Sequence, residues 1–229
     1  MRVGILADAH GNLAGLDACL NFLRGRNIAH CLYLGDAVGY FAQSEAVCAR
    51  LRALSPTIVQ GNHEAMLAGQ LPVTPEARDI IRLPSRPGPQ TLLWLRECAA
   101  VGPCREVRLG GRRIHMAHGS PQNPLLGRIE SSDQVTATGY DVIVLGHTHR
   151  PFVGCSPSGA LALNPGSCGY PRDNGRCLSL AVLDTVSMAA EIFRIPFVWP
   201  QDLLEQAHSA VRRALNRMAP PLGTMVALP

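Results

Sequence analysis

The sequence predicts an α/β fold of the α+β type, with two mixed β-sheets packed face to face as a sandwich and helices on the outside (α/β/β/α). In the first third of the chain, short apolar runs alternate with helical patterns, which is typical of βαβ units and a largely parallel sheet. Later, paired apolar runs flank glycine-containing turns, which is typical of hairpins. The 229 residues, 47% of them apolar and 17% charged, suffice for a globular domain with a sizeable core.

The N-terminal part carries three expected strands and two expected helices. The strands are short apolar runs, each closed by polar residues or glycine: Arg2–Ala7, His30–Leu34 and Thr57–Gln60. Asn12 is the expected N-cap of a first helix, which ends near Gly25 and has leucines at helical spacing. The second helix is Ser44–Leu54.

The rest of the chain predicts further helices and strand pairs. Short helices are expected around Glu76–Ile81, inside a proline-rich stretch, and at Gln90–Ala99. Strands are expected at Arg105–Leu109, Arg112–Ala117, Asp141–Leu145, Phe152–Cys155, Ala160–Leu163, Cys177–Leu183 and Met188–Ile195. An amphipathic helix is expected over Gln201–Met218, with Leu204, Ala207, Val211 and Leu215 on one side. We therefore expect a main domain over residues 1–197, and a C-terminal helix and tail over 198–229 that pack on the same domain.

Composition narrows the class of protein. No apolar run is long enough to span a bilayer, and Asp8 interrupts the first apolar run, unlike a signal peptide, so we expect a soluble cytoplasmic protein with no membrane partner. All 21 basic residues are arginine, which excludes a Schiff-base lysine and a phosphate loop with its lysine. The eight cysteines show no zinc-finger spacing and are expected to be reduced, mostly buried side chains.

Ligand-type side chains follow five of the expected strands. Five of the eight histidines lie in these positions, beside Asp8, Asp36 and Asn62; they are His10, His63, His118, His147 and His149. Because the carboxyl ends of parallel strands meet at one edge of a sheet, we expect these residues to lie together. Core packing explains any one of them, but not all five together.

The residue types and their spacing indicate a site for two metal ions. Asp8 and His10 are two residues apart, so in an extended chain they point the same way and can bind one ion, while Asp36 can bridge both ions. Imidazole nitrogens mixed with carboxylate and amide oxygens suit Mn, Fe, Zn, Co or Ni, and we favour Mn. Two such ions hold a hydroxide between them, and this hydroxide can attack the phosphorus of a phosphoester in line with the leaving oxygen. His63 is the best candidate to protonate the leaving oxygen.

Five motifs, in this order, resemble those of the calcineurin-like metallophosphoesterase family, in its small single-domain bacterial branch. They are Asp8-Ala9-His10-Gly11-Asn12, Gly35-Asp36, Gly61-Asn62-His63-Glu64, His118-Gly119 and Gly146-His147-Thr148-His149. The resemblance covers roughly residues 1–197 and implies the two-sheet sandwich and phosphodiesterase or phosphatase activity. It implies that Asp8, His10, Asp36 and His149 hold the first metal, that Asp36, Asn62, His118 and His147 hold the second, and that His63 is catalytic. Glu64 replaces the commoner aspartate.

The expected substrate is a small-molecule phosphoester such as a nucleotide. Asn12, Arg150 and Arg172 are candidate substrate contacts, although helix capping explains Asn12 equally well. Nucleic acid is not expected, because the arginines of the 105–113 hairpin have no aromatic residues among them. Two alternatives stay open: a phosphoprotein phosphatase, and a non-catalytic binding module on the same fold. The sequence also leaves open a homo-oligomer, in which the C-terminal helix makes the contact.

Overall fold

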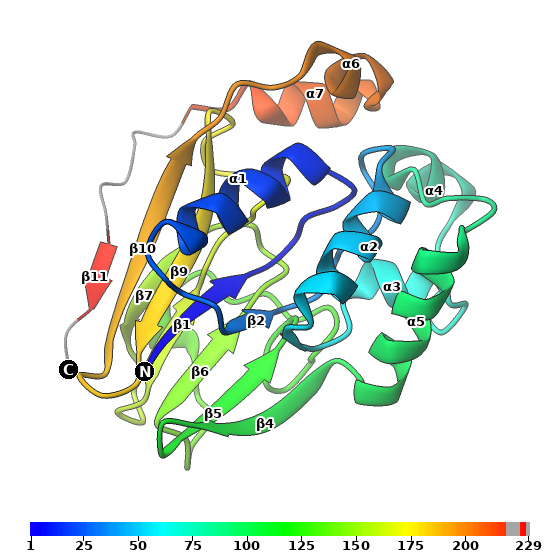
Figure 1. Cartoon of the computed structure of the whole chain (residues 1–229). Coiled ribbons are helices and arrows are strands. Elements are labelled where there is room, and N and C mark those ends of the chain that lie inside the picture. Colours follow the sequence, from blue (N-terminus) through cyan, green and yellow to red (C-terminus); the bar gives the residue numbers. More distant parts are fainter. Residues whose placement is uncertain (219–224, 228–229) are drawn as a thin grey trace.

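The computed structural model describes residues 1–218 and 225–227, and two β-sheets form its centre (Figure 1). The first sheet has the strand order β11–β10–β9–β1–β2–β3. Its strands are β1 (Arg2–Leu6), β2 (Cys31–Tyr33), β3 (Thr57–Ile58), β9 (Cys177–Asp184), β10 (Ala189–Pro196) and β11 (Met225–Ala227). β1, β2 and β3 are parallel, whereas β9 runs antiparallel to β1 and β10 runs antiparallel to β9 and β11. The sheet is therefore mixed, as expected.

The second sheet has the order β4–β5–β6–β8–β7. Its strands are β4 (Cys104–Leu109), β5 (Arg112–Ala117), β6 (Val142–Leu145), β7 (Phe152–Cys155) and β8 (Leu161–Asn164). β5, β6 and β8 are parallel, and the edge strands β4 and β7 are antiparallel to their neighbours. Both expected hairpins are present in this sheet, because Gly110-Gly111 and the turn at 156–159 allow the chain to reverse.

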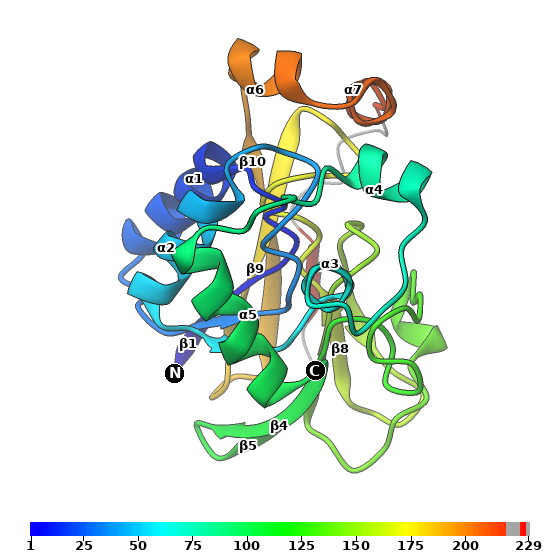
Figure 2. The same cartoon turned by 90° about the vertical axis from the view of Figure 1, so that its right-hand side faces the viewer.

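Period-two alternation along the strands produces the layers. Val3 and Ile5 of β1 pack against the second sheet with Ile114 and Met116, whereas Leu6 faces the helices with Leu16 and Leu20. The sandwich interior is thus apolar, and the outer face of the first sheet is covered by helices (Figure 2). The outer face of the second sheet is covered by the segment between β5 and β6, where Val135 is fully buried and the one helical element is the short 3₁₀ helix η1 (Ser132–Gln134).

The helices of the first two-thirds of the chain lie near their expected positions. They are α1 (Leu13–Arg24), α2 (Ser44–Leu54), α3 (Asn62–Leu67), α4 (Pro75–Ile81) and α5 (Pro89–Val101). The helix α3 was not expected from the sequence: it begins at Asn62, inside the Gly61-Asn62-His63-Glu64 motif. The N–H of Gly61 donates to the Glu64 carboxylate (3.0 Å), which stabilises this first turn.

The expected single helix over Gln201–Met218 is wrong. The segment contains two short helices, α6 (Gln201–Gln206) and α7 (Ser209–Leu215), at the end of the molecule to which β10 runs (Figure 1). Ala207 and His208 have extended backbone, and Nδ1 of His208 accepts the N–H of Ala210 (3.1 Å), so a new helix begins there. Leu203, Ala207, Val211 and Leu215 are buried in the same core as α1 and α2. A domain boundary at residue 197 stays a prediction, and residues 219–224 and 228–229 of the expected tail lie outside the described residues.

Two sequence expectations concern exposure. Within the described residues, every helix is too short or too polar to span a bilayer. The eight cysteines are free: Cys19, Cys31, Cys48, Cys98 and Cys168 are buried, Cys104 and Cys177 are half-buried, and Cys155 is exposed.

Candidate metal centre

The loops that follow five strands of the two sheets meet at one edge of the sandwich. Asp8 and His10 follow β1, Asp36 follows β2, and Asn62 and His63 begin α3 after β3. From the second sheet, His118 follows β5, and His147 and His149 follow β6. All of these side chains are buried except that of His147, which is half-buried. The structure thus brings together all the residues that the sequence analysis selected as ligands, together with His63.

Left-handed backbone conformations aim these side chains. The φ angles are 59° at Asp8, 49° at His10, 59° at Asp36, 66° at His147 and 59° at His149. A non-glycine residue in this region costs about 1–2 kcal/mol, and such strain typically clusters at functional sites. The expectation that Asp8 and His10 share a direction because the chain is extended is wrong, since β1 ends at Leu6 and both residues lie in a turn. They do converge, but through positive φ angles.

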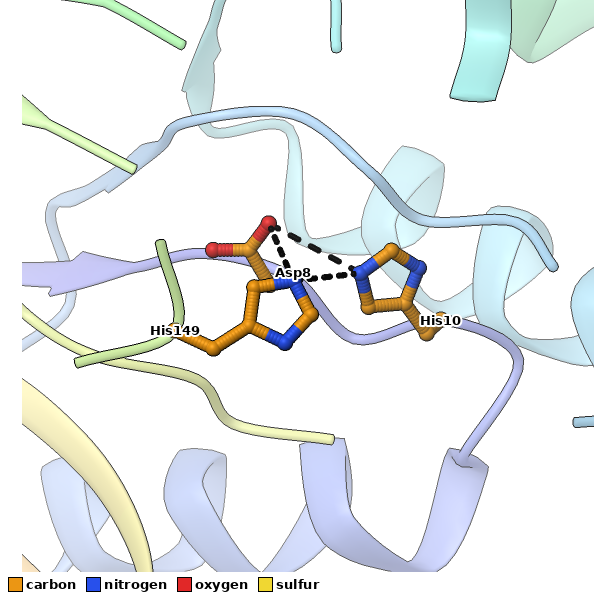
Figure 3. Close-up of side chains that lie close together, drawn as sticks. All are labelled: Asp8, His10 and His149. Carbon is orange, nitrogen blue, oxygen red and sulfur yellow. Dashed lines mark hydrogen bonds and ion pairs between the residues drawn. The ribbon is translucent and has the colours of Figure 1, made fainter. Parts of the chain in front are cut away.

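Asp8, His10 and His149 form the first group of ligand atoms (Figure 3). The Nε2 atom of His149 lies 3.5 Å from Oδ1 of Asp8 and 3.0 Å from Nε2 of His10. Both histidines have Nδ1 next to a backbone carbonyl, that of Val38 (3.1 Å) for His10 and that of Tyr170 (2.5 Å) for His149. Because a carbonyl only accepts, each Nδ1 carries the hydrogen and each Nε2 presents a lone pair.

This first group has the chemistry of a cation site. Two lone pairs face each other at 3.0 Å, and neither carboxylate oxygen of the fully buried Asp8 has a hydrogen-bond partner among the described residues. A buried polar atom without a partner costs about 1–3 kcal/mol, and more when it is charged. A divalent cation accepts electron pairs from all three side chains, and the carbonyl contacts at Nδ1 are the usual second partners of metal-bound histidines. The residues therefore fit a metal ion.

Asp36, His118 and His147 form the second group, with the amide of Asn62 beside them. Nδ1 of His118 donates to the carbonyl of Leu34 (2.6 Å), which leaves Nε2 of His118 to face Oδ1 of Asn62 at 2.9 Å. Nδ1 of His147 lies at the same distance from that oxygen, 2.9 Å. These atoms converge from three loops, and they fit a second ion of the kind that takes nitrogen and oxygen ligands.

Asp36 lies between the two groups. Its Oδ2 atom is 3.7 Å from Nε2 of His10 in the first group and 3.5 Å from Nε2 of His118 in the second. Oδ2 is also 3.8 Å from Nε2 of His63, while Oδ1 accepts the backbone N–H of His63 (2.8 Å). Asp36 thus has the position expected of a bridging carboxylate, and His63 lies beside both groups.

Burial and mutual charge set the protonation of the site. Burial raises the pKa of Asp8 well above its usual range, and it lowers the pKa of His10, His63 and His149. Burial also opposes ionisation of Asp36, but His118 and His63 outweigh this effect and lower the pKa of the Asp36 carboxyl. Asp36 in turn outweighs burial at His118 and raises its pKa to about 9. Burial and the neighbouring His118 lower the pKa of His147 to about 3, so the site holds mostly neutral imidazoles at pH 7.

Comparison with known proteins agrees with this geometry. Residues 1–188 match the calcineurin-like phosphoesterase superfamily domain. The chain belongs to this superfamily. An uncharacterised protein of Methanocaldococcus jannaschii is 27% identical over 220 residues, which cover 85% of this chain and 87% of the relative.

Solved structures share the fold of this calcineurin-like phosphoesterase. A metallophosphoesterase from Sphaerobacter thermophilus has a TM-score of 0.74 and 21% identity, and the alignment covers 94% of this chain and 98% of that one. A hypothetical protein from Pyrococcus horikoshii OT3 has a TM-score of 0.72 and 20% identity, with 93% and 97% covered. A novel archaeal phosphodiesterase has a TM-score of 0.52 and 18% identity, with 85% and 100% covered.

The three expected substrate contacts of the phosphoesterase differ in position. Asn12 is fully buried: its Oδ1 accepts the N–H of Gly15 (2.9 Å) and its Nδ2 donates to the carbonyl of Gly169 (3.0 Å). The side chain therefore caps α1 from a fully buried position, and a contact with substrate stays a prediction. Arg172 is half-buried and donates to the hydroxyl of Tyr40 (2.9 Å), whereas Arg150 is exposed and lies 3.5 Å from Glu130. Both arginines remain available to an anion.

Sequence reasoning missed two kinds of supporting residue. The Glu64 carboxylate accepts the N–H groups of Asp36 (2.8 Å) and Ala37 (2.6 Å), so it holds the loop that carries the bridging carboxylate. The ring of Tyr40 contacts the rings of His10 and His63, with centroids 4.7 and 4.9 Å apart. Tyr40 therefore packs against the site itself. The available sequence signal for the role of Glu64 was an acidic residue directly after the Asn62-His63 pair.

Proposed function

We propose that this calcineurin-like phosphoesterase hydrolyses a phosphodiester or phosphomonoester of a small molecule, such as a nucleotide, with two divalent metal ions. The observation that carries the proposal is the position of Asp36 between two groups of ligand atoms, with Oδ2 at 3.7 Å from Nε2 of His10 and 3.5 Å from Nε2 of His118. The favoured ion is Mn, with Fe, Zn, Ni or Co as the other candidates. The fold shared with a solved archaeal phosphodiesterase supports a reaction of this class.

Each group of residues has a task in the proposed reaction. Asp8, His10, Asp36 and His149 would hold one ion, and Asp36, Asn62, His118 and His147 the other. When bound, the two ions lower the pKa of a water molecule and neutralise the oxygens of the phosphoryl group. The short loops around the ligands exclude bulk water, since all but one of the seven ligand side chains are buried.

His63 would supply the proton to the leaving oxygen. Its Nδ1 lies 3.0 Å from the carbonyl of Val38, so the ring is fixed and Nε2 points toward Asp36. Burial lowers the pKa of His63, and a bound phosphate dianion would favour the protonated ring again. The proton then leaves from Nε2, while Nδ1 keeps its hydrogen on the carbonyl of Val38.

Two variants separate metal binding from proton transfer. Asp36→Ala removes the shared ligand, so the purified protein should lose metal measured by plasma mass spectrometry and also lose turnover. His63→Ala should keep both metals and lower kcat by about 10²–10⁴-fold, the usual range for general acid catalysis. His30→Ala, at a histidine outside the site, is the matched control and should retain both properties.

The choice of leaving group gives a more specific test of the proton-donor role of His63. Phenol is a poorer leaving group than p-nitrophenol, so His63→Ala should slow phenyl phosphate hydrolysis more than p-nitrophenyl phosphate hydrolysis. The assay starts from metal-free protein, to which Mn²⁺, Ni²⁺, Zn²⁺ or Mg²⁺ is added singly, and bis-p-nitrophenyl phosphate tests the diesterase activity. Equal loss with both monoesters would contradict the proton-donor role. A folded, metal-loaded protein that turns over none of the esters would favour a binding module.

The cellular setting belongs to the same proposal. We place the protein in the cytoplasm, where free cysteines persist and nucleotide esters are available, and we assign it a small-molecule partner rather than a nucleic acid or a membrane.

A further inference from the structure

A small pocket beside the metal centre gathers four arginines. The pocket has a volume of about 300 Å³, and its basic side chains come from four separate segments: Arg128, Arg150, Arg172 and Arg217. Arg128 precedes η1, Arg150 follows His149, Arg172 follows β8, and Arg217 follows α7. Such a volume lies at the low end of the range for small-ligand sites. No single sequence motif joins these four arginines to the metal ligands.

Two tyrosines separate the pocket from the candidate metal ligands. Tyr40 and Tyr170 line the pocket, and their ring centroids are 4.6 Å apart. On the other side, the Tyr40 ring contacts His10 at 4.7 Å and the Tyr170 ring contacts His149 at 5.4 Å. The pocket is therefore about one aromatic ring away from the first group of ligands, which is within the reach of a single small substrate.

The charge of the pocket favours a strongly anionic occupant. Among the described residues that line it, none is acidic. Glu130 lies nearby, 3.0 Å from Arg128 and 3.5 Å from Arg150, so one carboxylate offsets part of the positive charge. The guanidinium of Arg172 donates to the Tyr40 hydroxyl and lies over the faces of both tyrosines, which are neutral groups. Guanidinium groups present forked donors that match phosphate oxygens.

The remaining walls restrict what the anion is attached to. Ile80 of α4 and Ala210, Val211 and Ala214 of α7 form the rest of the pocket lining. The tyrosine rings are 9% and 5% exposed, so they offer no face on which a base of single-stranded nucleic acid could stack. A compact anion on a small molecule fits these walls better than a polymer.

We propose that this arginine pocket binds a second phosphate group of the substrate, so that the preferred substrate carries one phosphate at the metal centre and another between Arg172 and Arg217. The inference rests on the proposed function, because it assumes that a phosphoester is hydrolysed at the metal centre. It adds a substrate class, bisphosphorylated small molecules, and it gives the C-terminal helix α7 a role as a wall of the substrate site.

A matched pair of chromogenic esters tests the substrate class. Thymidine 5′-(p-nitrophenyl phosphate) and the same ester with an added 3′-phosphate share the scissile bond and differ in one phosphate. With the metal-loaded enzyme, KM should be roughly tenfold or more lower for the bisphosphate, the gain expected from charge-assisted contacts at a partly exposed site. Arg217→Gln, with Arg128→Gln as a second variant, should reduce this preference. Arg213→Gln, on the adjoining helix α7 but outside the pocket, is the matched control and should keep it.

A binding measurement separates failure of the pocket from failure of the enzyme. Titration calorimetry with thymidine 3′,5′-bisphosphate and metal-free protein should show binding that Arg217→Gln weakens roughly tenfold and Arg213→Gln leaves unchanged. Equal KM values for the two esters, unaffected by Arg217→Gln, would overturn the pocket while the proposed function stands. If neither ester is hydrolysed with any metal, the proposed function fails. In that case binding sensitive to Arg217 sustains the anion site, and absence of binding overturns it.

Discussion

The hydrogen bonds of Glu64 give a testable prediction about how the protein holds its metal centre in place. The side chain is fully buried, and its two oxygens accept four N–H groups. Oε2 accepts from Asp36 (2.8 Å) and Gly61 (3.0 Å), and Oε1 accepts from Ala37 (2.6 Å) and the indole of Trp94 (3.3 Å). One carboxylate therefore connects the loop after β2, the start of α3 and the helix α5.

Glu64→Gln keeps the shape of this side chain and removes one acceptor. The amide has a single oxygen, so one pair of N–H groups faces an NH₂ group instead. Each buried donor left without a partner costs about 1–3 kcal/mol, so two of them cost roughly 2–6 kcal/mol. A protein with a typical stability of about 5–15 kcal/mol would lose a large share of it. The loop with Asp36 should also lose its position, and metal affinity should fall.

Urea unfolding of the metal-free protein measures the first effect, and metal content after dialysis measures the second. Glu97→Gln is the matched control, because Glu97 on α5 is exposed and pairs only with Arg52 in a surface contact of 2.8 Å. That change should stay within about 1 kcal/mol, as surface ion pairs contribute little. If Glu64→Gln unfolded at the same urea concentration as the wild type and kept its metal, the positioning role of Glu64 would be refuted.

Two further predictions concern the same edge of the sandwich. At Gly61 an added Cβ would overlap the carboxylate and the backbone nitrogen of Asp36, so Gly61→Ala should lower both the melting temperature and the metal content. Gly69→Ala is the comparison: an added Cβ there meets open space at positive φ, so this change should lower only the melting temperature, and by less. The second prediction is that metal-free protein loses stability as the pH falls below 6.5. Folded histidines such as His147, whose pKa is lowered to about 3, stay neutral while the unfolded chain takes up protons, so the loss continues from pH 6.5 to about 3. Urea midpoints at pH 6.5 and 5.5 measure it, because above pH 6.5 the raised pKa of His118, about 9, changes stability in the opposite direction. A midpoint that rises from pH 6.5 to 5.5 would contradict the assignment.

Much of the fold follows from local signals in the sequence. The boundaries of α2 match the expected Ser44–Leu54, and Asn12 caps α1 as expected. These features depend on neighbouring residues, through helical periodicity and a side chain that accepts a nearby N–H. The division of 201–218 into α6 and α7 did not follow from periodicity: His208 caps α7, and its Nε2 lies 3.7 Å from Asp79 of α4, a residue distant in sequence. Amphipathic spacing alone is the same for one long helix and for two short ones.

The sequence by itself determined which chemical groups the site contains. Five motifs in order specified imidazoles, carboxylates and an amide at the ends of successive strands, and strand ends on parallel sheets share an edge. Residue spacing alone did not decide how those groups are divided, although the family resemblance implied a division. The tertiary structure places Asp8, His10 and His149 together, and it puts Asp36 between them and His118. The physical reason is that the division depends on positive φ angles in turns and on contacts between loops of different sheets. Neither the positive φ angles nor the contacts between loops produce a pattern at fixed spacing in the sequence. The same is true of the four arginines that meet in a pocket from four separate segments.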